Sequence, residues 1–340
     1  MLKGLLLFIT GIFISLTIRA YLIFNGSEVG DIHALWEMGD LTLRGVNPYI
    51  ALNYNTYPPL ALYLQAATIK LSAFLDIPFY ILIKFWPNLA DLLITFLLCY
   101  FLIKQGLSKV SAYAWSLIFF LNPVSIIISA SHGQIDSVPS LLVISSILLM
   151  IFKKTLSYTL LSAFLLGLAI AIKPNPLILL PLLLTFKRTS IKNAVLFLLI
   201  SIVPVSILIW PFLQDYPNLI LTKLLNYSGS KDFGLPAILR GFYYLKTSDY
   251  NLIFSEDVLR LSKMIFLIGF LILVLIFRYS GKLIIACLAA YLLFLTIYFG
   301  ISAQYLSWIL PFAILNKDLM IIPYSIASFL TLIGLSLIHI

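Results

Sequence analysis

Long apolar runs separated by short polar segments make up most of this sequence. The first run extends from the N-terminus to about residue 24. It is longer than the roughly 7–15 apolar residues of a signal peptide, and no small-residue cleavage site follows it, so it predicts a retained membrane helix. The later runs cover 58–75, 81–103, 113–128, 138–152, 156–186, 194–212, 261–277, 283–299, 305–315 and 319–338. Because about 20 apolar residues span a bilayer, the pattern predicts an all-α, polytopic transmembrane helix bundle. We expect about ten or eleven helices in one domain over residues 1–340.

Composition supports this interpretation and excludes other classes of protein. Hydrophobic residues make up 62% of the chain and charged residues 10%, against about 45–50% and 25% in soluble domains. Subtracting 13 acidic from 22 basic residues gives a net charge of +9. No basic stripe is interleaved with base-stacking aromatic residues, so this charge predicts loops facing anionic membrane lipids rather than nucleic-acid binding. We therefore expect a multi-pass protein of the cell membrane.

Two polar stretches interrupt the pattern, residues 25–56 and 213–260. Short loops rich in Lys and Arg usually face the cytoplasm. The basic clusters at 187–192 and 278–282 then place both polar stretches on the outer side, as a first and a second outer loop. The second loop also holds basic residues, but long loops cross the membrane largely regardless of charge.

The first outer loop concentrates polar chemistry in a chain with few charges. It contains Asp31, His33, Glu37 and Asp40, and residues 32–43 are expected to form a short amphipathic helix along the membrane interface. Asp31 would lie just outside the first membrane helix. A plainer interpretation remains open, in which these are solvated loop charges and Asp31 caps a helix.

Several motifs together point to one family. Asp31 is followed by Gly-Val-Asn-Pro-Tyr at 45–49 and by Tyr-Pro-Pro-Leu at 57–60. This combination resembles the GT-C superfamily of membrane glycosyltransferases, which use polyprenyl-phosphate-linked sugars as donors. Three later stretches, 131–137, 166–174 and 303–311, are similar to motifs of the same superfamily, in the same order. The long C-terminal soluble domain of some members has no counterpart here.

The resemblance implies a hexosyltransferase that moves mannose or another hexose to a lipid- or protein-linked acceptor. A sugar joined to phosphate already carries a good leaving group, so one carboxylate acting as base on the acceptor hydroxyl is sufficient. Attack from the opposite face of the sugar would invert the anomeric carbon. We expect Asp31 to be this base. No cofactor is certain, no metal ligands are assigned, and a divalent metal remains open.

Substrate-binding residues are expected in the later motifs and in the second outer loop. The motif resemblance assigns His132, Gln134, Asp136, Gln304 and Tyr305. A helix starting there would place His132 and Asp136 on one face, or the segment is an ordinary interhelical turn.

Two cations, with His132 as a third candidate, are expected to surround the donor phosphate. Lys173 lies in a long apolar run, where a charge is costly, and Arg240 offers a bidentate fork for phosphate. Alternatively, Pro174 breaks the helix and Lys173 reaches the interface, and Arg240 belongs to a solvated loop. Asp91 is expected to pair with Lys84 or Lys70 rather than to act in catalysis.

Topology leaves one conflict. If each of the three apolar runs between residues 57 and 132 crosses the membrane once, segment 131–137 lies opposite Asp31. The resemblance implies the same side, with one run broken or re-entrant.

Two other functions remain as alternatives. A transporter or flippase of lipid-linked glycans predicts internal repeats with broken helices, and none is evident. A structural membrane subunit leaves the carboxylates of the first loop unexplained.

Overall fold

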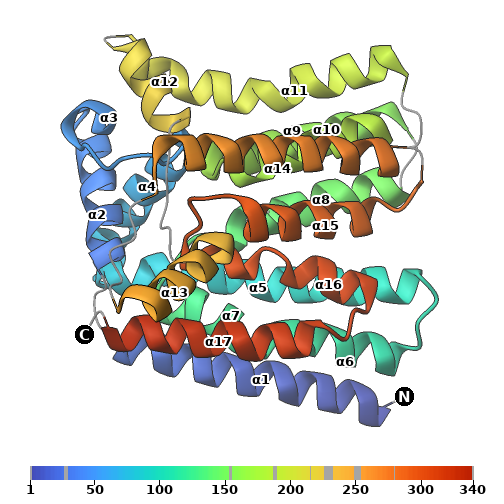
Figure 1. The fold of residues 1–340 in the computed structure, drawn as a ribbon. Helices are drawn as coiled ribbons and strands as arrows, with labels where there is room; N and C mark the ends of the chain where they lie inside the picture. The colour runs from blue at the N-terminus through green and yellow to red at the C-terminus, as the bar shows by residue number, and fades with distance from the viewer. Residues whose placement is uncertain are drawn as a thin grey trace.

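The computed structural model describes residues 2–26, 30–152, 155–186, 190–214, 216–225, 233–248, 254–278 and 280–338. Within these ranges every regular element is a helix, and most of them run side by side in one bundle (Figure 1). The predicted all-α fold is confirmed.

The helices follow one another in an order close to the apolar runs of the sequence. In the first half they are α1 (Leu2–Asn25), α2 (Gly30–Leu43), α3 (Pro48–Ala51), α4 (Pro59–Leu75), α5 (Phe79–Lys104), α6 (Lys109–Phe120), α7 (Pro123–Ile126), η1 (Ile127–Ser131), α8 (Ser137–Phe152) and α9 (Leu156–Ile172). In the second half they are η2 (Asn175–Leu179), α10 (Leu180–Thr185), α11 (Ile191–Ile209), η4 (Trp210–Phe212), α12 (Pro217–Leu225), α13 (Gly234–Thr247), α14 (Glu256–Phe277), α15 (Leu283–Ile297), η5 (Ala303–Ser307), α16 (Leu310–Asn316) and α17 (Ile321–Ile338).

Four helical segments of the described chain are long and apolar enough to cross a membrane. They are Leu2–Asn25, Phe79–Lys104, Ile191–Phe212 and Glu256–Phe277. A fifth consists of Lys109–Phe120 and Pro123–Ser131, which are bent by 45° relative to each other. Six shorter apolar helices of 10–17 residues accompany them.

Two boundaries differ from the apolar pattern for local reasons. The run 156–186 is not one helix, because Pro174 follows α9 and a proline excludes its predecessor from the helical region. Lys173 accordingly has an extended backbone, with φ −144° and ψ 147°. The helix expected from 261 begins at Glu256, where the Ser255 hydroxyl accepts a hydrogen bond from the Val258 amide. Glu256 and Asp257 are polar, yet acidic residues stabilise the first turn of a helix.

The segments at one end of the bundle resolve the topological conflict. Helices α2, α3, α12 and α13 all lie at the end where α1 finishes, opposite the N-terminus (Figure 1). Helices α2 and α4 pack against each other across that end, so the run 58–75 is not a crossing. Only two crossings then separate Asp31 from segment 131–137. Asp31 and this segment therefore lie at the same end of the bundle.

A separate apolar cluster holds this end together. Ile32, Leu35 and Met38 are each no more than 2% exposed and form the buried face of α2. Their spacing of three residues is that of a helix stripe. They pack in one cluster with Ile135 and Ile172, which adjoin the polar residues Asp136 and Lys173 along the chain. The cluster therefore fixes α2 relative to both later motifs.

Candidate active site

Asp31 and Gln134 meet although they are 103 residues apart. Asp31 is in the first turn of α2, where the helix dipole favours a carboxylate, and its side chain is exposed. The Gln134 side chain is 2% exposed, and its Nε2 donates a hydrogen bond of 2.6 Å to Asp31 Oδ2. A buried amide thus orients a carboxylate that remains open to an incoming molecule.

The turn before α8 aims Gln134 at Asp31. After the π-helical turn η1, the amides of His132 and Gln134 donate to the carbonyls of Ile127 and Ile128 at 2.8 and 3.0 Å. Gly133 between them has φ +65°, a conformation that favours glycine. Helix α8 begins only at Ser137, so His132 and Asp136 do not share a helical face, and that expectation is wrong.

His132 lies beside the same carboxylate in a partly buried setting. Burial lowers the pKa of His132 below its ordinary value. The charge of Asp31 opposes this shift, and that of Lys84 reinforces it. The imidazole is therefore favoured in its neutral form, in which it can accept as well as donate a hydrogen bond.

Asp136 and Lys173 form a second, fully enclosed group. Lys173 Nζ lies 2.6 Å from Asp136 Oδ2, with side-chain exposures of 7% and 0%. The indole Nε1 of Trp308 donates to Asp136 Oδ1 at 2.8 Å. Pro174 does end the helix, as one alternative supposed, but Lys173 is held inside by Asp136.

Aromatic rings surround this ion pair. The Lys173 ammonium lies 5.3 Å from the ring centre of Tyr57 and 6.0 Å from that of Tyr305. The rings of Tyr305 and Trp308 stack with centres 3.9 Å apart. Gln304 precedes Tyr305 in η5 and is half-buried. Residues from four distant parts of the chain therefore meet at one place: Tyr57, Asp136, Lys173 and the pair Tyr305 and Trp308.

Arg240 comes from a different element. It lies on α13, and its guanidinium carbon is 5.7 Å from the centre of the Phe254 ring. Segment 226–232 of the second outer loop lies outside the described residues. The expected role of Arg240 at the donor phosphate stays a prediction.

The Asn-Pro-Tyr motif of the first loop holds that loop through a set of hydrogen bonds. The Asn47 side chain accepts from the Tyr49 amide at 3.1 Å and donates to the Phe212 carbonyl at 2.9 Å. The Tyr49 hydroxyl donates to the Tyr57 carbonyl at 2.7 Å, and Lys223 Nζ donates to the Tyr49 carbonyl at 2.6 Å. The motif thus joins the first loop to the start of the second.

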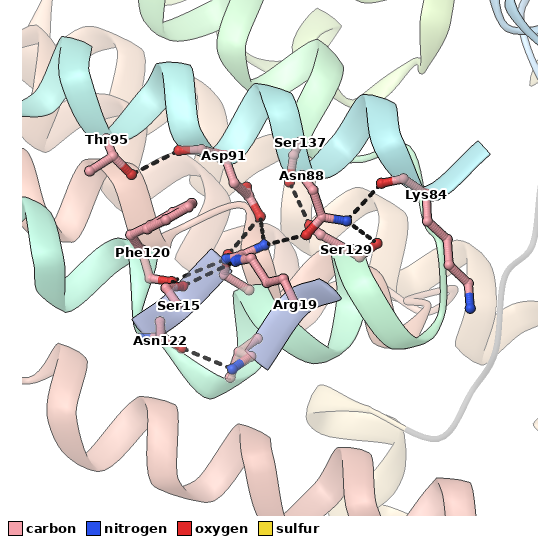
Figure 2. A network of polar contacts seen from close by, with 12 residues as sticks. Ser15, Arg19, Lys84, Asn88, Asp91, Thr95, Phe120, Asn122, Ser129 and Ser137 are labelled. Carbon is pink, nitrogen blue, oxygen red and sulfur yellow. Dashed lines mark hydrogen bonds and ion pairs between the residues drawn. The ribbon is translucent and has the colours of Figure 1, made fainter. Parts of the chain in front are cut away.

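Asp91 is bound by a residue that the sequence pattern did not suggest. Its partner is Arg19 of α1, with Nη1 2.8 Å from Asp91 Oδ2 and both side chains 1% exposed. Arg19 also donates to Asn88 Oδ1 at 2.8 Å (Figure 2) and to Ser125 Oγ at 2.8 Å. The expected pairing of Asp91 with Lys84 or Lys70 is therefore wrong. The network joins α1, α5 and α7, and Asn88 extends it to η1 by donating to the Ser129 carbonyl at 3.0 Å.

Among the described residues, no three His, Cys, Asp or Glu side chains lie close enough together to hold a metal ion.

The fold is that of a membrane helix bundle, with the polar residues of the candidate site gathered at one end of it. The chain belongs to glycosyltransferase family 87, whose sequence profile matches residues 55–302. It is accordingly a glycosyltransferase. No curated protein matches the sequence.

The family match covers most of the site but not all of it. It includes His132, Gln134, Asp136, Lys173 and Arg240, and it stops just before Gln304. Asp31 precedes it, so the assignment of Asp31 depends on its position in the structure.

Proposed function

We propose that this enzyme transfers a hexose, mannose first among the candidates, from a polyprenyl-phosphate donor to a lipid- or protein-linked acceptor. Transfer takes place at the outer face of the cell membrane and inverts the anomeric carbon. Family membership supports the transfer of a sugar. The donor class is supported by the motif resemblance and by a polar site at the end of a membrane bundle, where a lipid-borne phosphate can reach it.

The observation that carries the mechanism is the contrast between the two carboxylates of the site. Asp136 is fully buried and its charge is matched by Lys173. Asp31 is exposed, receives a hydrogen bond from Gln134 and has no ion pair among the described residues. A base must reach the proton that it removes. Asp31 meets this condition, and Asp136 does not.

The reaction then follows from ordinary acid–base chemistry. Asp31 takes the proton from the acceptor hydroxyl as its oxygen forms a bond to the anomeric carbon. The bond from that carbon to the phosphate oxygen breaks, and its electron pair leaves with the lipid phosphate. Charge-assisted hydrogen bonds to the departing phosphate stabilise the transition state.

The other residues of the site are proposed to hold the substrates. His132 and Gln134 are beside Asp31 and would contact the acceptor or the transferred sugar. Tyr305, with Gln304, offers a ring and an amide for a sugar face, while Asp136 orients Lys173. Lys173 and Arg240 remain proposed ligands of the donor phosphate.

The decisive experiment compares Asp31→Asn with Asp40→Asn on the same helix, where Asp40 is paired with Arg44 at 2.8 Å. Purified protein is incubated with labelled polyprenyl-phosphate mannose and a membrane lipid extract. Loss of a positioned base reduces rate by about 10²–10⁴-fold, so Asp31→Asn should lose transfer while Asp40→Asn keeps it.

Near-normal transfer by folded Asp31→Asn protein would refute the role of Asp31. No transfer by the unaltered enzyme from any polyprenyl-phosphate sugar would refute the donor class.

A further inference from the structure

Lys84 of α5 is a buried cation whose charge the described structure leaves unmatched. Its side chain is 0% exposed, and its Nζ has no hydrogen-bond acceptor among the described residues. Two other buried cations of the described chain differ from it, because Arg19 binds Asp91 and Lys173 binds Asp136. Figure 2 shows the Lys84 ammonium pointing away from the Arg19 network.

The position of Lys84 links it to the active site. A Cβ atom added to Gly133 would lie 3.0 Å from Lys84 Cγ, so the lysine stem packs on the turn between His132 and Gln134. A Cβ atom added to Gly26 would lie 3.0 Å from Lys84 Nζ, so the ammonium is beside the end of α1. Lys84 therefore lies between the end of α1 and the turn that holds Gln134.

A buried, unpaired ammonium is costly, since its hydration is lost without compensation. Cations within membrane proteins commonly mark the path of an anionic substrate. Lysine carries its ammonium on a flexible four-carbon stem, so rotation of the side chain alone changes the position of the charge.

We propose that Lys84 binds the phosphate group of the lipid-linked substrate. This inference rests on the proposed function, because it places the lipid phosphate beside the carboxylate of Asp31. Lys84 would add a further cation to the proposed phosphate ligands Lys173 and Arg240. The charge of Lys173 is already shared with Asp136, whereas that of Lys84 is available in full to the phosphate that leaves the sugar.

The test measures binding rather than transfer, so its failure is distinct from failure of the proposed function. The whole protein in detergent is titrated with a polyprenyl monophosphate, the matching polyprenol and inorganic phosphate, and thermal unfolding and dissociation constants are recorded. Variants are Lys84→Met, Lys84→Gln and, as the matched control, Lys104→Met at the exposed end of the same helix.

The unaltered protein should bind the polyprenyl monophosphate more tightly than the alcohol and be stabilised by it. Both Lys84 variants should bind it roughly 10- to 150-fold more weakly, the range for hydrogen bonds to charged groups, and Lys104→Met should not. Without ligand, Lys84→Met should unfold at the same temperature or higher, because an unmatched charge has been removed. Stabilisation by inorganic phosphate that also depends on Lys84 would support the phosphate site and show that it accepts the free ion.

Retained preference for the monophosphate over the alcohol in both variants would overturn the proposal. A large fall in unfolding temperature of both variants without ligand would overturn it as well, since the lysine would then be a structural residue.

Discussion

Replacing Lys173 by methionine removes one partner of the most enclosed ion pair in the site. Methionine has a similar length but no charge, so the Asp136 carboxylate would stay at 0% exposure with the Trp308 indole as its remaining donor at 2.8 Å. Removing one partner of a buried pair costs about 3–5 kcal/mol, because an uncompensated charge is left behind. Folded domains are stable by about 5–15 kcal/mol, so this loss is a large share.

The double variant Lys173→Met, Asp136→Asn separates the charge from the packing. Asparagine keeps an oxygen that can accept from Trp308 but carries no charge. We expect the double variant to recover part of the stability lost by Lys173→Met alone, because no bare carboxylate remains. The exposed Lys70, replaced by methionine, serves as the control and should change stability by less than about 0.5 kcal/mol.

The assay is equilibrium unfolding in mixed micelles, with intrinsic tryptophan fluorescence as the signal. Donor KM is measured on the same variants. If Lys173 chiefly supports Asp136, stability falls; if it contacts only the donor phosphate, donor KM rises while stability is unchanged. A free energy of unfolding for Lys173→Met within about 1 kcal/mol of the parent would refute the ion-pair reasoning. So would a double variant less stable than Lys173→Met.

Two further predictions follow from the site and from the bundle. Because burial holds the pKa of His132 below its ordinary 6.5, the unfolded chain binds the proton more readily, and stability should fall as pH drops below about 6.5. His132→Gln should show a smaller drop in unfolding temperature between about pH 7.5 and 5.5; an unchanged pH dependence would contradict this. For topology, single cysteines at exposed Ser190 and Ser255, in a background without the native cysteines, are treated with an impermeant thiol reagent in intact cells. Ser255 should be labelled and Ser190 protected, and the reverse pattern would invert the orientation.

The sequence predicted the helical fold well, because apolar length alone identifies most of the bundle. It predicted less well which runs cross, since 58–75 has the composition of a span and yet packs on α2 at the end of the bundle. Local signals could have found Arg19, which is a charge inside the first apolar run. Such a residue is expected to have a buried partner. Its pairing with Asp91 depends on how two distant helices pack, so the positions of the two residues along the sequence do not predict it.

Several residues of the candidate site were expected from motifs, but the contacts among them depend on tertiary structure. Asp31 and Gln134 were both expected in it, but their contact depends on the turn at Gly133 and on the packing of α2. Trp308 was part of a quoted motif without a role, because a donor to Asp136 can be recognised only once η5 is placed. The sequence also could not predict that Lys84 lacks an anionic partner, because Asp91 is close to it along the chain and was an expected partner.

Asp136 immediately precedes α8, and Lys173 immediately follows α9. The two helices have 16 and 17 residues and pack against each other, so they form a hairpin whose equal arms return the chain to the depth at which it started. Each residue inserted into one arm alone would displace its end by about 1.5 Å and rotate it by about 100°, which separates the ion pair. Insertions are therefore tolerable in the connection between the arms, or when both arms gain the same number of residues. The lengths of the two helices thus set the position of the Lys173 charge relative to Asp136.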